Sequence, residues 1–200
     1  MSEVILVANR AKLIPFRKEC DYIGIDAGAM YCLKHQIPMT CAIGDFDSID
    51  EIQLQNLKTC CEVIQLPVMK DQVDSEYALN YAHHQGYDKI SIYGVIGGRQ
   101  DHFIAMIQLL KKSTFPFTIW DEQNTIYCLE KGRYRLKKKR KYLSFFACEP
   151  LTISISGVKY PLHNRKITEN DLYLVSNEIL EKEAILEVDG KVLVLECDNK

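Results

Sequence analysis

The chain has 200 residues, 47% of them hydrophobic, so it can bury a substantial core in one domain or in two small ones. Its 25 basic and 27 acidic side chains give a formal net charge of −2, which offers no bulk attraction to nucleic acid or to an anionic membrane. It has no run of about 20 apolar residues and no signal-peptide pattern, so we expect a cytoplasmic protein that does not span a membrane.

Strands and helices alternate in the first part of the chain. Six apolar runs have the composition of strands buried on both faces of a parallel sheet; they occupy residues 4–8, 22–26, 41–45, 62–66, 89–95 and 117–121. Helical spacing is clearest in residues 74–86, where Asp74 or Ser75 can cap a helix and Gly86 can end it, and in residues 101–113.

The rest of the chain has a different character. Its apolar segments are short and rich in β-branched and aromatic residues; they occupy residues 125–129, 133–137, 142–148, 151–158, 171–176, 184–188 and 191–197. We therefore predict an α/β domain over residues 1–122 and an all-β sandwich domain over residues 123–200. The Asp189-Gly190 pair predicts a hairpin between the last two strands, and the basic run Lys137–Lys141 is interpreted as a solvated strand end or loop.

Eight cysteines are scattered through the apolar segments, with no C-x-x-C pair among them. This spacing argues against a zinc site and against a secreted disulfide framework. We interpret the cysteines as reduced residues of the core.

Acidic side chains follow several of the predicted strands. Asp26 ends one strand, Asp45 and Asp47 follow the next, and Asp71 and Asp74 lie just ahead of a helix. Because the carboxyl ends of parallel strands share one edge of a sheet, these carboxylates should gather where ligands bind. Carboxylates held close together are costly to keep ionised unless a cation neutralises them, and Mg²⁺ with phosphate oxygens fits that requirement.

Each of these acids also has a purely structural interpretation. A single aspartate after a strand is more often a turn former or a helix cap, and Asp47 or Ser48 could cap the helix that follows. The repetition of acids at one predicted edge favours the ligand site. Asp50 and Glu51 are interpreted as charges of a first helical turn.

A glycine-rich loop follows the strand at residues 89–95. Gly97 and Gly98 expose backbone N–H groups, Arg99 supplies a guanidinium, and Asp101 adds an acid before a helix. This composition suits a triphosphate, although neither a P-loop nor the dinucleotide fingerprint is complete. His102 fits a phosphate donor and a helix N-terminal residue equally well.

The segments DAGAMYCLKHQIPMTCAIGDFDSI, KDQVDSEYAL and YGVIGGRQDH, with the later GVKYPL and VSNEI, resemble the bacterial thiamine pyrophosphokinases in matching order across nearly the whole chain. The family pattern usually reads D-G-G and D-x-T-D where this chain has Ala27 and Val73. Neither departure removes a charged group.

The resemblance implies an α/β domain that holds Mg²⁺ and ATP, a β-sandwich domain that binds thiamine, and a homodimer with active sites across its interface. By position, the metal group would be Asp45, Asp47 and Asp74, with Arg99 as the further catalytic residue. Nucleotide or phosphate contacts would be Asp26, Ser48, Lys70, Asp71, Gly97, Gly98, Arg99 and His102. Thiamine contacts would be Asp101, Tyr160, Ser176 and Asn177.

The implied reaction is an in-line attack of the thiamine hydroxyl on the β-phosphorus of ATP, with AMP leaving. No Ser-His or Cys-His arrangement is evident, so we expect no covalent enzyme intermediate. Two rivals stay open: a metal-dependent phosphohydrolase or other small-alcohol kinase on the same acidic edge, and a non-catalytic sensor of thiamine or nucleotide. Tyr160 could likewise be an ordinary sandwich residue.

Overall fold

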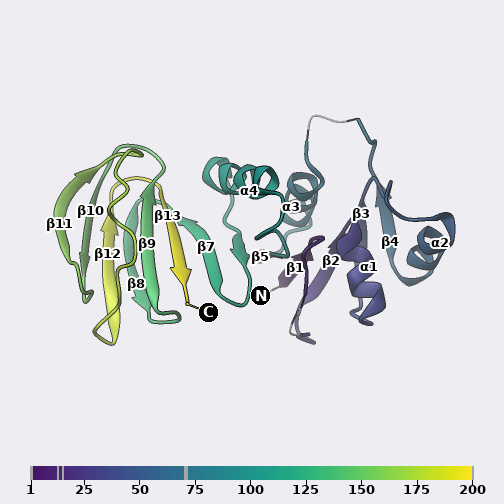
Figure 1. Ribbon diagram of the computed structural model, residues 1–200, viewed down its shortest axis with the longest axis horizontal. Coiled ribbons are helices and arrows are strands. Elements are labelled where there is room, and N and C mark those ends of the chain that lie inside the picture. The colour runs from purple at the N-terminus through teal and green to yellow at the C-terminus, as the bar shows by residue number, and fades with distance from the viewer. Residues whose placement is uncertain (1, 13, 15, 70–71, 200) are drawn as a thin grey trace. The chain divides into compact units, whose positions relative to one another are not determined.

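The computed structural model describes residues 2–12, 14, 16–69 and 72–199. It divides into two compact units, Met1–Trp120 and Asp121–Lys200 (Figure 1). Within the part of the chain that is described, no helix is long and apolar enough to cross a membrane.

The first unit is built on a parallel sheet whose strands are buried as the apolar runs predict. The strands are β1 (Glu3–Val7), β2 (Asp21–Ile25), β3 (Cys41–Gly44), β4 (Glu62–Gln65), β5 (Lys89–Tyr93) and β6 (Thr118–Trp120). They lie in the order β4-β3-β2-β1-β5-β6, and every pairing is parallel. The helices are α1 (Ala27–Lys34), α2 (Glu51–Cys60), α3 (Asp74–His84) and α4 (Gln100–Lys112). The predicted α/β architecture is confirmed.

The strand order places a switch point beside β1. From β1 the chain adds β2, β3 and β4 on one side of the sheet, and then returns to add β5 and β6 on the other. Ile5 and Val7 of β1 pack with Cys32 of α1 and Tyr93 of β5, so this central strand is fixed from both directions. A crevice at the carboxyl ends of β1 and β5 is the usual place for a ligand in such a sheet.

The start of α2 differs from the expectation. Asp50 is its N-cap and forms a capping box with Gln53, with 2.7 Å from Gln53 N to Asp50 Oδ1 and 3.1 Å from Asp50 N to Gln53 Oε1. The alternative in which Asp47 or Ser48 caps this helix is therefore wrong, and so is the placing of Asp50 in the first turn. The Asp50 side chain accepts a hydrogen bond from a free N–H group at the N-terminus of α2. The residues of the preceding loop are therefore not needed as caps.

The start of α3 also differs from the expectation. Val73 is at the N-cap with no side-chain cap, and Asp74 is the first helical residue, so neither Asp74 nor Ser75 caps the helix. An acid in the first turn still interacts favourably with the helix dipole. The end of the helix is as predicted, because Gly86 follows it with a φ of 80°.

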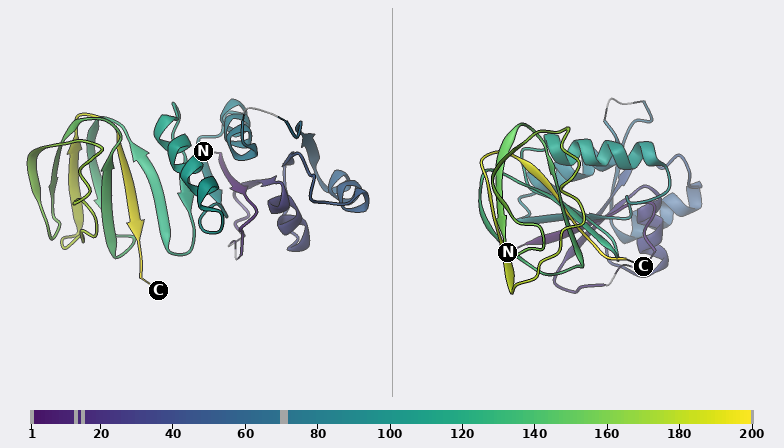
Figure 2. Two further views of the ribbon diagram at one scale, coloured as in Figure 1. Left: turned by 45° about the horizontal axis from the view of Figure 1, so that its top comes forward. Right: turned by 60° about the vertical axis from the view of Figure 1, so that its left-hand side comes forward.

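The second unit is an antiparallel β-sandwich (Figures 1 and 2). Its strands are β7 (Asn124–Leu129), β8 (Gly132–Lys137), β9 (Tyr142–Ala147), β10 (Leu151–Ser156), β11 (Leu162–Ile167), β12 (Glu183–Val188) and β13 (Val192–Cys197). One layer has the order β7-β13-β9 and the other β11-β10-β12-β8. Phe145 and Val194 of the first layer pack with Ile153 and Leu186 of the second in one core. The predicted sandwich is confirmed.

The predicted hairpin at Asp189-Gly190 is wrong. The strands on its two sides, β12 and β13, belong to different layers, so the turn crosses between layers. A type I′ hairpin needs positive φ at both central residues, and neither Asp189 nor Gly190 has it. The Asp189 carboxylate instead accepts a hydrogen bond from Thr152 N at the start of β10.

One predicted strand is absent from the described structure, and one strand that was not predicted is present. Residues 171–176 do not form a strand, whereas Leu162–Ile167 forms β11 at the edge of its layer. Residues 163–166 of this strand are exposed and polar, so β11 lacks the apolar alternation from which the other strands were predicted.

The cysteines are free thiols, as expected, but they are not all in the core. Cys20, Cys32 and Cys41 are buried, whereas Cys60 at the end of α2 is exposed. Burial raises the pKa of the Cys32 thiol to about 12 and that of Cys41 to about 11, so both stay protonated near neutral pH.

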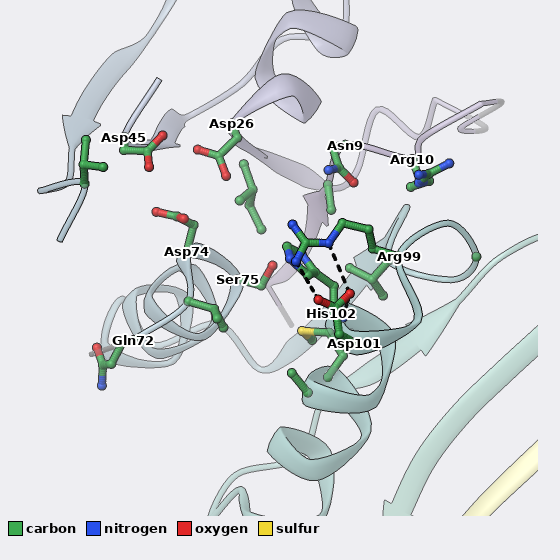
Figure 3. A pocket seen from close by; sticks show the side chains of 18 residues that line it. Asn9, Arg10, Asp26, Asp45, Gln72, Asp74, Ser75, Arg99, Asp101 and His102 are labelled. Atoms are coloured by element: carbon green, nitrogen blue, oxygen red, sulfur yellow. Dashed lines mark hydrogen bonds and ion pairs between the residues drawn. The ribbon is translucent and has the colours of Figure 1, made fainter. Parts of the chain in front are cut away.

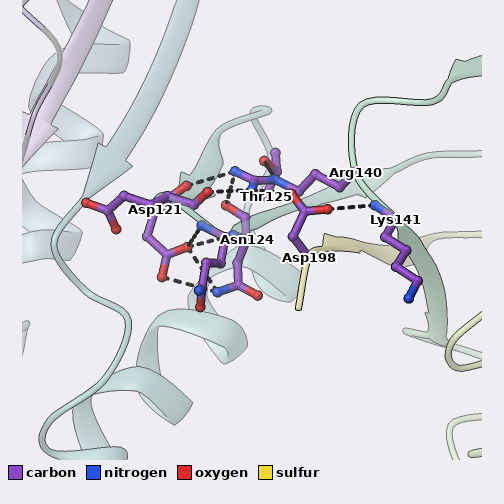
Figure 4. Close-up of polar contacts among 8 residues, drawn as sticks. Asp121, Asn124, Thr125, Arg140, Lys141 and Asp198 are labelled. Carbon is purple, nitrogen blue, oxygen red and sulfur yellow. Dashed lines mark hydrogen bonds and ion pairs between the residues drawn. The ribbon is translucent and has the colours of Figure 1, made fainter. Parts of the chain in front are cut away.

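Arg140 departs from the prediction that its basic run is solvated (Figure 4). Its side chain is only 14% exposed, and its guanidinium donates to the backbone oxygens of residues 121, 122 and 124 and to Thr125 Oγ1. It also pairs with Asp198 at 3.2 Å. Arg140 therefore ties the start of the second unit to its C-terminal segment.

Replacement of Arg140 by lysine should destabilise the second unit by about 2 kcal/mol, because an ammonium cannot reach several backbone carbonyl oxygens at once. Thermal and urea unfolding would measure the loss. The control is Lys139→Ala at an exposed neighbouring position, which should change the unfolding free energy by less than about 0.5 kcal/mol. Equal stability of Arg140→Lys and the native chain would contradict the structural role.

Candidate active site

A cavity of about 450 Å³ lies at the carboxyl edge of the parallel sheet, and we call it the edge cavity (Figure 3). The segments that follow β1 to β5 line it together with the first turn of α3 and the first two turns of α4. Its polar lining residues are Asn9, Arg10, Asp26, Asp45, Gln72, Asp74, Ser75, Arg99, Asp101 and His102. The cavity therefore occupies the crevice that the strand order predicts.

Charges of opposite sign occupy two sides of the edge cavity. Figure 3 shows the carboxylates of Asp26, Asp45 and Asp74 on one side and the side chains of Arg10, Arg99 and His102 on the other, where Asp101 pairs with Arg99. The three acids come from the ends of β2 and β3 and from the start of α3. An elongated ligand that carries phosphate, with a cation toward the acids, matches this division of charge.

The Asp26 carboxylate is held in place by an unusual backbone. Asp26 has φ 47° and ψ −122°, a region that glycine favours, and its N–H donates to Ile43 O at 3.0 Å. Gly44 lies against it, because a Cβ at Gly44 would overlap the Asp26 carboxylate. Strain of this kind persists where the surrounding structure enforces it, and it is concentrated at functional sites.

Phe46 sets the positions of the acids on either side of it. Phe46 is buried and has a φ of 55°, so the loop after β3 is anchored in the core between Asp45 and Asp47. Asp45 lines the edge cavity and accepts a hydrogen bond from Asp47 N at 3.2 Å. Asp47 and Ser48 are exposed and do not line the cavity.

Among the described residues, no group of three or more His, Cys, Asp or Glu side chains is close enough to hold a metal ion. Lys70 and Asp71, which were also predicted to contribute, lie outside the described residues. Mg²⁺ needs only one or two carboxylates when phosphate oxygens and water complete its shell. The oxygen donors on the acidic side fit that requirement.

Arg99 and Asp101 form a bidentate ion pair at the start of α4. Arg99 Nε and Nη2 donate to the two Asp101 carboxylate oxygens at 3.2 and 2.5 Å. The Arg99 guanidinium holds the pKa of Asp101 below its ordinary value, so Asp101 is ionised at neutral pH. Both side chains are more than half exposed, which makes the pair weak and open to exchange with a ligand.

Sequence reasoning missed the contribution of β1. Asn9 and Arg10 follow β1 at the same edge as the acids, and both line the edge cavity. Arg10 packs against the glycine loop, since a Cβ at Gly98 would overlap its guanidinium. Gly97 lines the cavity and Gly98 does not. The acids were predicted because each is a polar residue just after a strand, and the same reasoning would have identified Asn9 and Arg10.

The residues predicted to contact thiamine fall in both units. Asp101 lines the edge cavity, whereas Tyr160 and Asn177 line a mostly apolar cavity of about 340 Å³ in the second unit, which we call the sandwich cavity. Tyr160 is 59% exposed, and Lys159 Nζ lies 5.5 Å from the centroid of its ring, in cation–π contact with it. Ser176 does not line the sandwich cavity.

Comparisons with known proteins agree across both units. Residues 16–119 match the family described as "Thiamin pyrophosphokinase, catalytic domain", and residues 126–193 match "Thiamin pyrophosphokinase, vitamin B1 binding domain". The curated thiamine pyrophosphokinase of Bacillus subtilis (strain 168) is 32% identical over 182 residues, which are 87% of this chain and 85% of that protein. The solved B. subtilis thiamine pyrophosphokinase matches with a TM-score of 0.86 at 30% identity, covering 100% of both chains. A thiamin pyrophosphokinase family protein from Enterococcus faecalis matches equally, with a TM-score of 0.86 at 28% identity and 100% of both chains covered.

The Arg99–Asp101 pair should contribute little to stability. We predict that Asp101→Asn shifts the melting temperature by less than about 3 °C, because an exposed ion pair gains little over its solvated partners. Differential scanning calorimetry at neutral pH would measure the shift, with Arg99→Gln as the matched partner variant. A large drop in either variant would mean that the pair is a structural element and is not held ready for a ligand.

Proposed function

The chain belongs to the thiamine pyrophosphokinase family and is an enzyme that transfers pyrophosphate from ATP to thiamine, and we propose that this transfer takes place in the edge cavity. One observation carries the proposal: the acidic side of the edge cavity, with Asp26, Asp45 and Asp74, faces the guanidiniums of Arg10 and Arg99 at the switch point of the sheet, and Arg99 is paired with the further carboxylate of Asp101. The reaction yields thiamine diphosphate and AMP, so the site must hold both ends of a triphosphate.

The basic side of the edge cavity would bind the phosphates. Arg99 can exchange Asp101 for phosphate oxygens without loss of a strong contact, and its planar fork can grip two of them. Arg10 would supply a second guanidinium from the end of β1. Backbone N–H groups near Gly97 and the N-terminus of α4 add favourable partial charge.

The acidic side would hold Mg²⁺. Asp45 and Asp74 are the residues that we assign to the metal, with Asp26 beside them and Asp47 close in the same loop. When bound, the metal would neutralise charge on the phosphate oxygens. Asp74 lies in the first turn of α3, where the helix dipole interacts favourably with a carboxylate.

The chain's own groups would mainly position the reactants. Phosphoryl transfer depends on alignment and on charge neutralisation more than on covalent catalysis. Arg99 would receive the charge that develops on the transferred group, and an Asp of the acidic side would orient the thiamine hydroxyl toward the β-phosphorus. Asp101, once separated from Arg99, would accept a hydrogen bond from the aminopyrimidine of thiamine.

Residues of the second unit would complete the binding site for thiamine. Its thiazolium is permanently positive, and an exposed aromatic ring is a suitable host for a cation. Tyr160 is the ring that we assign to this role, and its backbone N–H donates to Asn177, the neighbour of Ser176 in sequence.

The Asp74→Asn variant should lower kcat by at least about a hundredfold while the fold is retained, because a neutral amide cannot balance the charge that Asp74 provides. The assay follows AMP and thiamine diphosphate together at saturating Mg²⁺. Glu51→Gln, an exposed charge in the first turn of α2, is the control and should keep full activity. Normal turnover in Asp74→Asn would remove this residue from the site.

We further propose a homodimer in which each active site combines the edge cavity of one protomer with the second unit of its partner. Support comes from exposed apolar side chains on that unit, Leu172, Tyr173, Val175 and Leu180, which lie at 44 to 66% exposure. Such side chains in one sequence segment are typical of a surface that another protein covers.

Mixed dimers would test the shared site. At a thiamine concentration well below the native KM, Asp74→Asn should be inactive and Tyr160→Ala should keep about a tenth of wild-type activity or less. Refolding them together should restore about a quarter of wild-type activity, since half the dimers are mixed and each mixed dimer has one intact site. Native mass spectrometry would count the mixed dimers. If they form and stay inactive, each site is built within a single chain.

A further inference from the structure

The segment Leu174–Glu178 is fastened along the edge of β9, although it forms no regular strand. Phe145 N donates to Leu174 O at 2.9 Å, and Leu143 and Asn177 exchange both backbone hydrogen bonds, at 2.8 and 3.0 Å. Ser176 N donates to the Ser144 hydroxyl at 3.0 Å. Ser176 itself has a φ of 59°, so its backbone is held in a region that serine rarely adopts.

The same segment is fastened on its other side to the residues around Tyr160. Lys159 N donates to Glu178 O at 2.9 Å, and Lys159 Nζ pairs with the Glu178 carboxylate at 3.2 Å. Val158 and Ile179 form an isolated bridge beside them. Tyr160 therefore sits at the end of a short ladder that begins on β9.

The side chain of Asn177 makes the last hydrogen bonds of that ladder, to the backbone of Tyr160. Tyr160 N donates to Asn177 Oδ1 at 3.0 Å, and Asn177 Nδ2 donates back to Tyr160 O at 2.9 Å. Glu178 N donates to the same Oδ1 at 2.9 Å. The amide thus satisfies both backbone groups of Tyr160, as a neighbouring strand would.

Little of this amide remains for a ligand. Asn177 is 7% exposed, both lone pairs of Oδ1 are occupied, and one of the two Nδ2 protons is donated to Tyr160. Loss of the side chain would leave the N–H and C=O of Tyr160 without these partners in a partly buried place. The backbone of Tyr160 would then be free to rotate, and the ring would move with it.

We propose that Asn177 is a positioning residue of the thiamine site, which acts by fixing the backbone of Tyr160 and thereby the direction of its ring. This inference rests on the proposed role of Tyr160 in binding thiamine, and it assigns Asn177 no direct contact with the substrate. The Tyr160 ring needs such support because it is more than half exposed, and packing alone does not hold it. An aromatic host binds a cation well only when its face is already aimed at the cation.

A double-mutant cycle tests the inference. Asn177→Ala should raise KM for thiamine by about tenfold, while KM for ATP stays within about twofold of the native value. Tyr160→Ala should raise KM for thiamine at least as much. In the double variant, Asn177→Ala should add less than about a twofold effect, because the ring that it positions is already gone.

Controls separate this role from general damage to the fold. Asn170→Ala removes an exposed amide from the loop before the segment and should leave both KM values unchanged. Melting temperatures identify a variant that fails to fold. If Asn177→Ala fails, Asn177→Asp replaces it, since a carboxylate keeps the acceptor for Tyr160 N and replaces the donor to Tyr160 O by an oxygen that repels it.

The outcomes are distinct. A raised thiamine KM that vanishes on the Tyr160→Ala background supports positioning through the ring. Independent, multiplying effects of the two variants would show that Asn177 touches thiamine itself and would overturn the inference while leaving the proposed function intact. An unchanged thiamine KM in Tyr160→Ala would instead contradict the proposed role of Tyr160.

Discussion

The gathering of Asp26, Asp45 and Asp74 at one edge of a parallel sheet is the constraint on which the site depends. Parallel strands bring their carboxyl ends together, so acids placed after successive strands must share one region of space. Their mutual repulsion is tolerable only when opposite charge is close. Arg10 and Arg99 face them across the cavity, and a ligand with bound metal would complete the balance.

The same edge explains where the backbone departs from ordinary geometry. Asp26 and Phe46 both have positive φ, one beside the missing side chain of Gly44 and the other anchored in the core. Ser176 repeats this pattern in the second unit, where the ladder to β9 enforces it. In both units the strained residues lie next to those assigned to a substrate, so a rigid surrounding structure and the site arise from the same contacts.

Much of this arrangement was predictable from the sequence. Long apolar runs predicted the parallel strands correctly because burial on both faces leaves a strong composition signal, and the position of Asp45 after such a run placed it at the cavity. The failures share a physical cause. The strand β11 is exposed and polar, the Asp189 turn is set by a contact with Thr152, and Arg140 is buried by partners distant in sequence, so none of them has a local signature.

The ion pair between Arg99 and Asp101 has a consequence for the order in which the two substrates bind. A guanidinium whose two donors bind phosphate can no longer pair with Asp101, so nucleotide binding would release the Asp101 carboxylate from its ion pair. Since we assign that carboxylate to the aminopyrimidine of thiamine, thiamine would gain this hydrogen bond only after ATP has bound. An enzyme built in this way would favour an ordered path, in which ATP binds before thiamine.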